Sequence, residues 1–110
     1  MPGPSGRSGR QGSVRFSSDA EKDLEGIGAY ASENFGAVQE QKYRDSLLRV
    51  LELLAVFPKL GSEQEHIAVG LRRHVHAAHA IYYSKHKDGL LVERILGSGQ
   101  DPLFQFSDKK

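Results

Sequence analysis

Apolar residues recur at three- and four-residue spacing through the first half of the chain, a pattern that predicts amphipathic helices. Ser18 followed by Glu21 is a capping-box pattern, so we expect the first helix to begin at Asp19. Gly36 predicts the end of this helix, because glycine adopts the left-handed conformation of helix ends without steric cost. The apolar stripe between these two signals consists of Leu24, Ile27, Ala31 and Phe35.

A second apolar stripe predicts another helix over residues 38–57, and Pro58 and Gly61 close it. Its apolar face comprises Tyr43, Leu47, Val50, Leu51, Leu54 and Phe57. The two helices should form an antiparallel hairpin. Ordering two helices costs about as much free energy as burying their stripes gains, so we expect this hairpin to pack on a further layer.

Short runs of β-forming residues supply that layer, mostly after a polar connector over residues 62–69. The predicted strands cover residues 14–17, 71–75, 79–84 and 90–96. Asp88 and Gly89 form a strong hairpin signal between the last two. The sequence therefore predicts an α+β fold, in which a helical hairpin packs on a small antiparallel β-sheet in the order β-α-α-β-β-β.

The ends of the chain differ in composition from this single predicted domain, which covers residues 14–106. Residues 1–13 are almost all Gly, Ser, Pro, Arg and Gln, a composition typical of a disordered tail. Three origins stay open for the tail: an expression scar, an upstream start codon, or a native basic arm that carries Arg7 and Arg10. Residues 107–110 form the C-terminal end.

Composition narrows the functional classes. The chain has 110 residues, no cysteine and a formal net charge of +1. Disulfides and thiolate metal sites are excluded, and a charge this small does not indicate direct, sequence-specific nucleic-acid binding through bulk electrostatics. No apolar run is long enough for a signal peptide or a membrane span, so we expect no membrane association and a cytoplasmic location.

A histidine cluster is the only group with metal-ligand character, and it consists of His74, His76 and His79. Residues two apart on a strand share a face, so His74 and His76 would approach the same point. His79 would have to fold back across a turn to join them. We predict polar histidines on the open face of a hairpin and no metal site, and we find no nearby partner spacing that supports acid–base catalysis.

Several cations in the predicted sheet suggest a basic patch: Arg72, Arg73, Lys85, Lys87 and Arg94. Such a patch would hold an acidic peptide or a phosphate backbone. The alternative is that these cations are solvated and pair with Asp88 and Glu93. Arg94 is the strongest functional candidate, because it lies among apolar strand residues where an unpaired cation is costly.

The tail of the predicted domain is apolar. Leu103, Phe104 and Phe106 follow the sequence Asp101-Pro102. Aromatic side chains beyond a last strand either fold back onto the core or remain exposed as anchors for a partner, and both outcomes stay open here.

The order of these elements resembles the ParE-type toxins of the RelE/ParE superfamily. The resemblance spans residues 14–106, and it rests on the order of elements together with three short strand motifs. These motifs are Gly70-Leu71-Arg72, Ala80-Ile81-Tyr82-Tyr83 and Arg94-Ile95-Leu96-Gly97. The resemblance implies the toxin half of a bacterial type II toxin–antitoxin pair, which inhibits DNA gyrase by binding, without catalysis and without a cofactor.

The same resemblance implies two partners, DNA gyrase and a ParD-like antitoxin that forms a hetero-oligomer with the toxin. An amphipathic antitoxin segment would lie against the hairpin and the sheet. The residues expected on the antitoxin side are Leu24, Ile27, Tyr30, Tyr43, Arg72 and Arg73. The residues expected to contact gyrase are Arg94, Leu103, Phe104 and Phe106.

Two alternatives remain within this superfamily. A RelE-like, ribosome-dependent messenger-RNA interferase would use Arg72, Arg73, His79 and Arg94 for phosphate binding and proton transfer. The tail tyrosine common in that branch is missing here, since the last tyrosine is Tyr83. An inactive homologue that only occupies an antitoxin is the other alternative, because Gly97 and Gly99 stand where many ParE-like chains carry larger residues.

Overall fold

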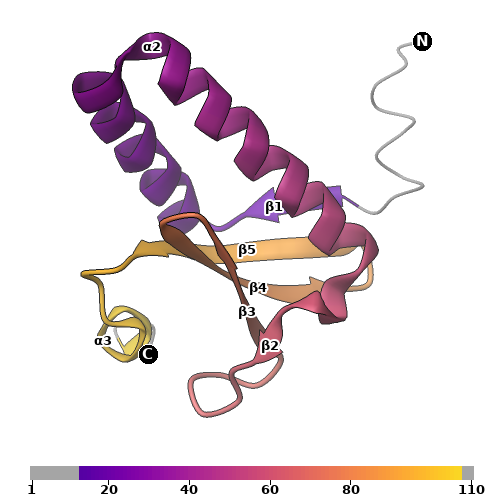
Figure 1. Cartoon of the computed structure of the whole chain (residues 1–110). Helices are drawn as coiled ribbons and strands as arrows, with labels where there is room; N and C mark the ends of the chain where they lie inside the picture. The colour runs from indigo at the N-terminus through magenta and orange to yellow at the C-terminus, as the bar shows by residue number, and fades with distance from the viewer. Residues whose placement is uncertain (1–12, 108–110) are drawn as a thin grey trace, which may run out of the picture.

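A five-stranded sheet forms the centre of the protein, which we describe from a computed structural model over residues 13–107. The sheet order is β1-β5-β4-β3-β2 (Figure 1). The strands are β1 (Ser13–Phe16), β2 (Ser62–Glu63), β3 (Leu71–His76), β4 (His79–His86) and β5 (Gly89–Gly97). Strands β3, β4 and β5 form the predicted antiparallel meander. The α+β fold is confirmed, with β2 as an unpredicted short edge strand inside the polar connector.

Strand β1 departs from the predicted antiparallel sheet, because it pairs parallel to β5. Parallel neighbours need a crossover connection. The connection from β1 to β5 begins with the helical hairpin, which follows β1 directly. The two strands meet very closely at Gly89, where φ is 134° and an added Cβ would lie 2.1 Å from the Ser13 carbonyl oxygen. Only glycine fits at this position. The tail predicted over residues 1–13 overlaps β1 at Ser13; residues 1–12 and 108–110 lie outside the described part of the chain.

The helical hairpin is α2 (Ser18–Val56), which is divided by a kink at Gly36. Gly36 has φ 87° and ψ 166°, so the predicted end of the first helix is confirmed. We call residues 18–35 the first arm and residues 37–56 the second arm. The predicted cap is wrong by one residue: Ser17 is the N-cap, and its hydroxyl accepts a hydrogen bond from the Ala20 amide at 3.0 Å. Ser17 also donates to the Glu93 carbonyl at 2.8 Å, and this bond to the sheet fixes where the helix begins.

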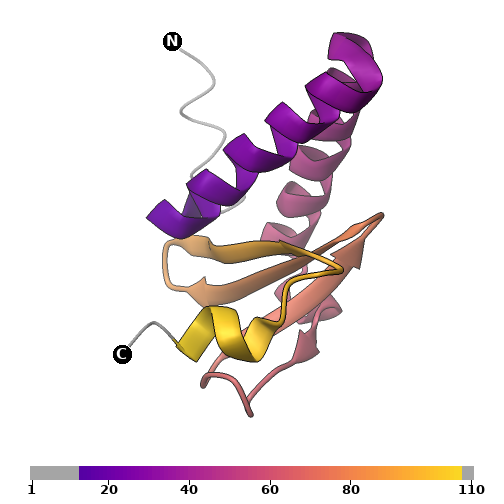
Figure 2. The ribbon, with the colours of Figure 1, turned by 90° about the vertical axis from the view of Figure 1, so that its left-hand side faces the viewer.

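Two apolar cores lie on the two faces of the sheet. Figure 2 shows the hairpin over one face and the short helix α3 (Pro102–Ser107) over the other. The buried residues of the larger core, under the hairpin, are Ala20, Leu47, Leu51, Leu54, Ile81, Tyr83, Leu90, Val92 and Ile95. Each large side chain buried there contributes about 1.5–3 kcal/mol, so this core holds the hairpin on the sheet.

The smaller core lies under α3 and the connector. It consists of Leu71, Tyr82 and Leu96, with Ile67, Ala80 and Phe106 packed against it. Adjacent Tyr82 and Tyr83 thus serve opposite cores. Strand β5 has a bulge at this point, because Tyr82 pairs with Arg94 while Tyr83 pairs with Val92 and Glu93 is the extra residue. The bulge places both Val92 and Ile95 in the larger core.

A 3-10 helix, η1 (Pro58–Leu60), ends the second arm and is fixed to the sheet by Tyr83. The Tyr83 hydroxyl donates to the Pro58 carbonyl at 2.6 Å and accepts from the Gly61 amide at 2.8 Å. Within residues 13–107, no helix combines the length and apolar character that crossing a membrane requires.

Candidate functional site

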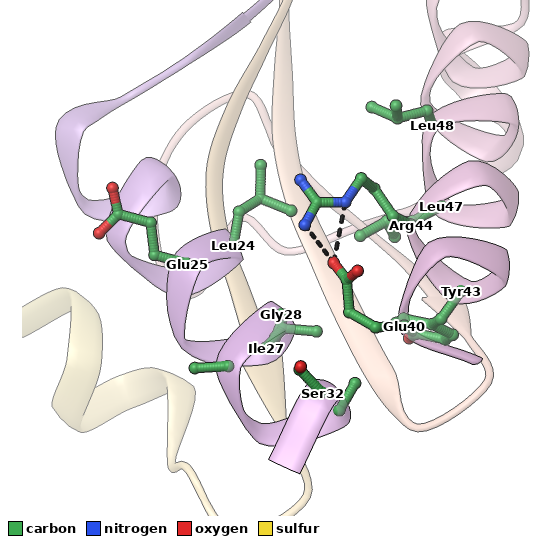
Figure 3. A pocket seen from close by; sticks show the side chains of 12 residues that line it. Leu24, Glu25, Ile27, Gly28, Ser32, Glu40, Tyr43, Arg44, Leu47 and Leu48 are labelled. Carbon is green, nitrogen blue, oxygen red and sulfur yellow. Dashed lines mark hydrogen bonds and ion pairs between the residues drawn. The ribbon is translucent and has the colours of Figure 1, made fainter. Parts of the chain in front are cut away.

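Two grooves open on the hairpin and share Ile27, Ala31 and Tyr43. The inter-arm groove has a volume of about 490 Å³ and separates the two arms (Figure 3). Its other lining residues include Leu24, Gly28, Ser32, Glu40, Arg44 and Leu47. The hairpin–sheet groove has a volume of about 730 Å³ and reaches the β3–β4 turn and the end of β5. Its other lining residues include Lys22, Asp23, Tyr30, Phe35, His79 and Gln100.

The inter-arm groove combines apolar walls with one ion pair. Glu40 and Arg44 lie one turn apart on the second arm, and their ion pair projects between the arms toward the first arm (Figure 3). Gly28 faces them from the first arm, where an added Cβ would lie 3.3 Å from a Glu40 carboxylate oxygen. Apolar walls beside a charged pair are suited to an amphipathic helix.

The hairpin–sheet groove ends in exposed aromatic side chains near the hairpin tip. Tyr30 and Phe35 are each 63% exposed. Their ring centroids lie 6.3 Å apart in an edge-on arrangement. Large exposed aromatic groups that continue a groove are typical of a surface that binds another protein.

The predicted antitoxin-side residues divide into two groups. Leu24, Ile27, Tyr30 and Tyr43 line the grooves, and three of them also pack against the larger core: Leu24, Ile27 and Tyr43. Arg72 and Arg73 lie on β3, away from the residues that line either groove.

Arg72 is engaged within the sheet edge. Its guanidinium lies 3.3 Å from the Glu63 carboxylate and donates to the Gly61 carbonyl at 2.6 Å. Arg73 is the cross-strand neighbour of Tyr82, the tyrosine of the smaller core. Arg94 is the neighbour of Tyr82 on the other side, so Arg73 and Arg94 share a face of the sheet, whereas Arg72 is held at the β2 edge by Glu63.

The histidine cluster is organised around Tyr43. The Tyr43 hydroxyl lies 2.7 Å from His79 Nδ1, and the Tyr43 ring stacks on His76 at 5.6 Å. Ser46 Oγ lies 3.0 Å from His76 Nε2. Thus His76 and His79 bind the second arm instead of projecting from an open hairpin face. Among residues 13–107, no three His, Cys, Asp or Glu side chains are arranged to hold a metal ion.

Burial controls the protonation of this cluster. It lowers the pKa of His76, with the nearby His74 as a secondary cause. It also lowers the pKa of His79, helped by His76 and opposed by Asp23, and it raises the pKa of Tyr43. Both histidines are therefore neutral at pH 7, which suits a hydrogen-bonded support better than a phosphate-binding cation.

Arg94 lies in an ion pair that the sequence did not reveal. Asp23 on the first arm accepts from Arg94 Nε at 2.8 Å and from the terminal nitrogen Nη2 at 3.0 Å. These hydrogen bonds raise the pKa of Arg94. The signal that could have found Asp23 was the need of a half-buried strand arginine for a carboxylate, together with the acidic start of the helix that follows β1.

The apolar tail serves both purposes that the sequence left open. Phe106 packs on Tyr82 with ring centroids 5.4 Å apart, so it folds back onto the smaller core. On the same helix, Leu103 is 55% exposed and Phe104 is 64% exposed. The structure thus presents two apolar side chains on a helix that a third one anchors.

Known proteins share this arrangement of elements. The sequence model of a family described as the ParE toxin of the type II toxin–antitoxin system parDE matches residues 14–102. Toxin ParE1 from Caulobacter vibrioides is 31% identical over 81 residues, which cover 74% of this chain and 81% of that toxin. A chain of the chromosomal ParDE TA system from P. aeruginosa has the same fold, with a TM-score of 0.66 and 15% identity over 79% of this chain and 96% of that one. The chain therefore belongs to the ParE toxin family of type II toxin–antitoxin systems.

Proposed function

We propose that this ParE-type toxin inhibits DNA gyrase by binding it, and that a ParD-like antitoxin neutralises the toxin by docking on the hairpin. The observation that carries the proposal is the exposure of Leu103 and Phe104 on a helix anchored by Phe106. Exposed apolar side chains on a fixed support lose little conformational freedom on binding, which favours affinity. Both proposed partners act in the cytoplasm, so we place the toxin there as well.

Binding explains the site better than catalysis does. Three of the four groups that an RNA-cleaving toxin would use are engaged separately: Arg72 with Glu63, Arg94 with Asp23, and His79 with Tyr43. Cleavage of a phosphodiester needs an acid, a base and an anion-stabilising group around one reacting phosphate. The proposed mechanism involves neither a covalent step nor a cofactor.

The C-terminal segment is the proposed gyrase contact, and its predicted residues differ in access. Leu103 and Phe104 are free to contact a partner directly. Phe106 supports them from the smaller core. Arg94 has an 11% exposed side chain, so direct contact with gyrase would require its ion pair with Asp23 to open.

The hairpin grooves are the proposed antitoxin site. Leu24, Ile27, Tyr30 and Tyr43 supply apolar and aromatic lining there. An amphipathic antitoxin helix would place its apolar side chains between the arms and its polar side chains toward Glu40 and Arg44. The resulting complex is a hetero-oligomer. The similar P. aeruginosa structure, described as a ParDE system, supports a partner of the ParD type.

A supercoiling assay with purified gyrase tests the proposed target. The wild-type protein is expected to abolish supercoiling, and the double variant Leu103→Ala/Phe104→Ala is expected to require at least about tenfold more protein, because each anchor contributes about 1.5–3 kcal/mol when buried. Val69→Ala is the matched control, since Val69 is 90% exposed and lies in the connector. It should inhibit like the wild type.

Three other results would redirect the proposal. Equal inhibition by the double variant and the wild type would remove the C-terminal segment from the gyrase interface. Cleaved messages at ribosomes without loss of supercoiling would favour the interferase. Neither effect, with an antitoxin still bound, would favour the inactive homologue.

A further inference from the structure

Asp23 has an unusual number of bonds to the end of β5. Besides the two bonds from Arg94, its carboxylate accepts one from the Ile95 amide at 2.9 Å. Strand β1 pairs with β5 only as far as Val92, so Ile95 lies on the edge that β1 leaves open. Asp23 thus takes the place of a neighbouring strand there. The side chains of Asp23 and Arg94 are 10% and 11% exposed, so solvent screens the pair weakly.

The C-terminal segment, residues 97–107, begins where β5 ends and packs back onto the sheet near its other end. It begins with a turn in which the Gly97 amide donates to Gln100 Oε1 at 2.8 Å. Near its other end, Phe106 packs on Tyr82. Tyr82 is the direct partner of Arg94 in the β4–β5 register. Arg94, which Asp23 holds, therefore lies three residues before the start of the segment and opposite the tyrosine on which Phe106 packs.

The hairpin–sheet groove includes this junction. Asp23, Ile95 and Gln100 line it together with Tyr30 and Phe35. The surface proposed for the antitoxin and the base of the segment proposed for gyrase thus share residues.

We propose that Asp23 is a positioning residue for the C-terminal segment, which it fixes through Arg94 and Ile95. The orientation of Leu103 and Phe104 then depends on a carboxylate that belongs to the hairpin. The expectation that Asp23 also affects inhibition of gyrase rests on the proposed function, because it assumes that this segment contacts gyrase.

Hydrogen exchange in the free, full-length protein tests the inference without any partner. Asp23→Asn keeps the shape of the side chain and removes its charge. We expect the amides of Ile95 and of α3 to exchange at least about tenfold faster in this variant, while the β4 amides opposite Leu90 and Leu91 keep their protection. Asp23→Glu retains the carboxylate and should restore part of the protection of α3.

A fluorescent reporter gives a second measurement. The chain contains no tryptophan, so Phe104→Trp places a single one at an exposed position. In this background, Asp23→Asn is expected to change its emission anisotropy, whereas Asp45→Asn should not. Asp45 is a matched control, because it is an exposed residue of the second arm whose carboxylate accepts a local bond from Gln41.

The inference fails if α3 exchanges at the wild-type rate while only Ile95 accelerates, since Asp23 would then support the β5 edge alone. Equal acceleration across β4 would indicate a general loss of stability and would also overturn it. The supercoiling assay distinguishes a failure of this inference from a failure of the proposed function. Altered α3 exchange in a protein that never inhibits gyrase leaves the inference intact, and unaltered exchange in an inhibitory protein leaves the proposed function intact.

Discussion

At the scale of single residues, the contacts of polar side chains with distant elements decide their roles. The sequence marked Arg94 as a residue that needs a partner, because it is a cation among apolar strand residues, whereas it placed His79 on the open face of a hairpin. It did not reveal the partners, Tyr43 and Asp23, which lie 36 and 71 positions away. Long separations of this kind follow from the packing of the hairpin on the sheet, and no local spacing encodes them.

The histidines predict a pH dependence of stability. Burial lowers the pKa of His76 and His79 in the folded protein below the ordinary value of 6.5, so the unfolded chain binds more protons as the pH falls below 6.5. The contribution of these histidines to the free energy of unfolding should therefore be fully present above pH 6.5. It should decrease on acidification until the pH falls below their lowered pKa values. Urea unfolding between pH 7.5 and pH 5 measures this decrease.

A variant series isolates the cluster from the other titrating groups. His76→Gln/His79→Gln should flatten the dependence, because neither replacement takes up a proton. Val69→Ala is the control, because Val69 does not titrate and is 90% exposed in the connector, so its replacement should leave the slope unchanged. The same slope in the double variant and the wild type would contradict the assignment.

At the scale of elements, the sequence predicted best what is locally determined. The two arms and their break at Gly36 follow from apolar spacing and from the conformational freedom of glycine. The cap was misplaced by one residue, because Ser17 and Ser18 offer the same hydroxyl and only the bond from Ser17 to Glu93 separates them. Helix α3 was missed because its stability depends on the packing of Phe106 on Tyr82, a residue 24 positions earlier in the chain.

The kink offers a test at this scale. Gly36 has φ 87° and ψ 166°, a backbone conformation that residues with a Cβ occupy at a cost of about 1–3 kcal/mol. We expect Gly36→Ala to lower the free energy of unfolding by that amount, measured by urea unfolding. Gly26→Ala is the control. Gly26 lies inside the first arm with open space around it, so alanine there should raise the free energy of unfolding by about 0.5–1 kcal/mol. An unchanged free energy of unfolding in Gly36→Ala would show that the backbone at the hairpin tip can adopt another conformation at little cost.

At the scale of the whole molecule, the parallel pairing of β1 with β5 completes the five-stranded sheet. The sequence predicted β1 as a strand, but its partner and direction depend on the crossover of the hairpin. Five strands thereby form one sheet whose faces carry different cores. The candidate surfaces follow this division, with the grooves on the hairpin and the exposed tail residues on the helix of the opposite face.

A substitution at Gly89 tests the importance of the pairing between β1 and β5. An added Cβ would lie 2.1 Å from the Ser13 carbonyl oxygen, so we expect Gly89→Ala to separate β1 from β5 and to cost more than about 2 kcal/mol of stability. Hydrogen exchange should show early loss of protection at Ser17, whose amide donates to Val92. Gly99→Ala is the matched control, because open space surrounds Gly99. Wild-type stability of Gly89→Ala would show that the strands shift at little cost.

The same pairing has a consequence for how the toxin is made. Strand β1 is translated first among the strands and β5 last, yet they are neighbours in the finished sheet. Domains fold as their segments leave the ribosome, at about 5–20 residues per second, so β1 waits several seconds for its neighbour. Neither the complete sheet nor the tail helix α3 can form before β5 and residues 102–107 have left the ribosome. The surface that we propose for gyrase therefore appears later than the hairpin proposed for the antitoxin.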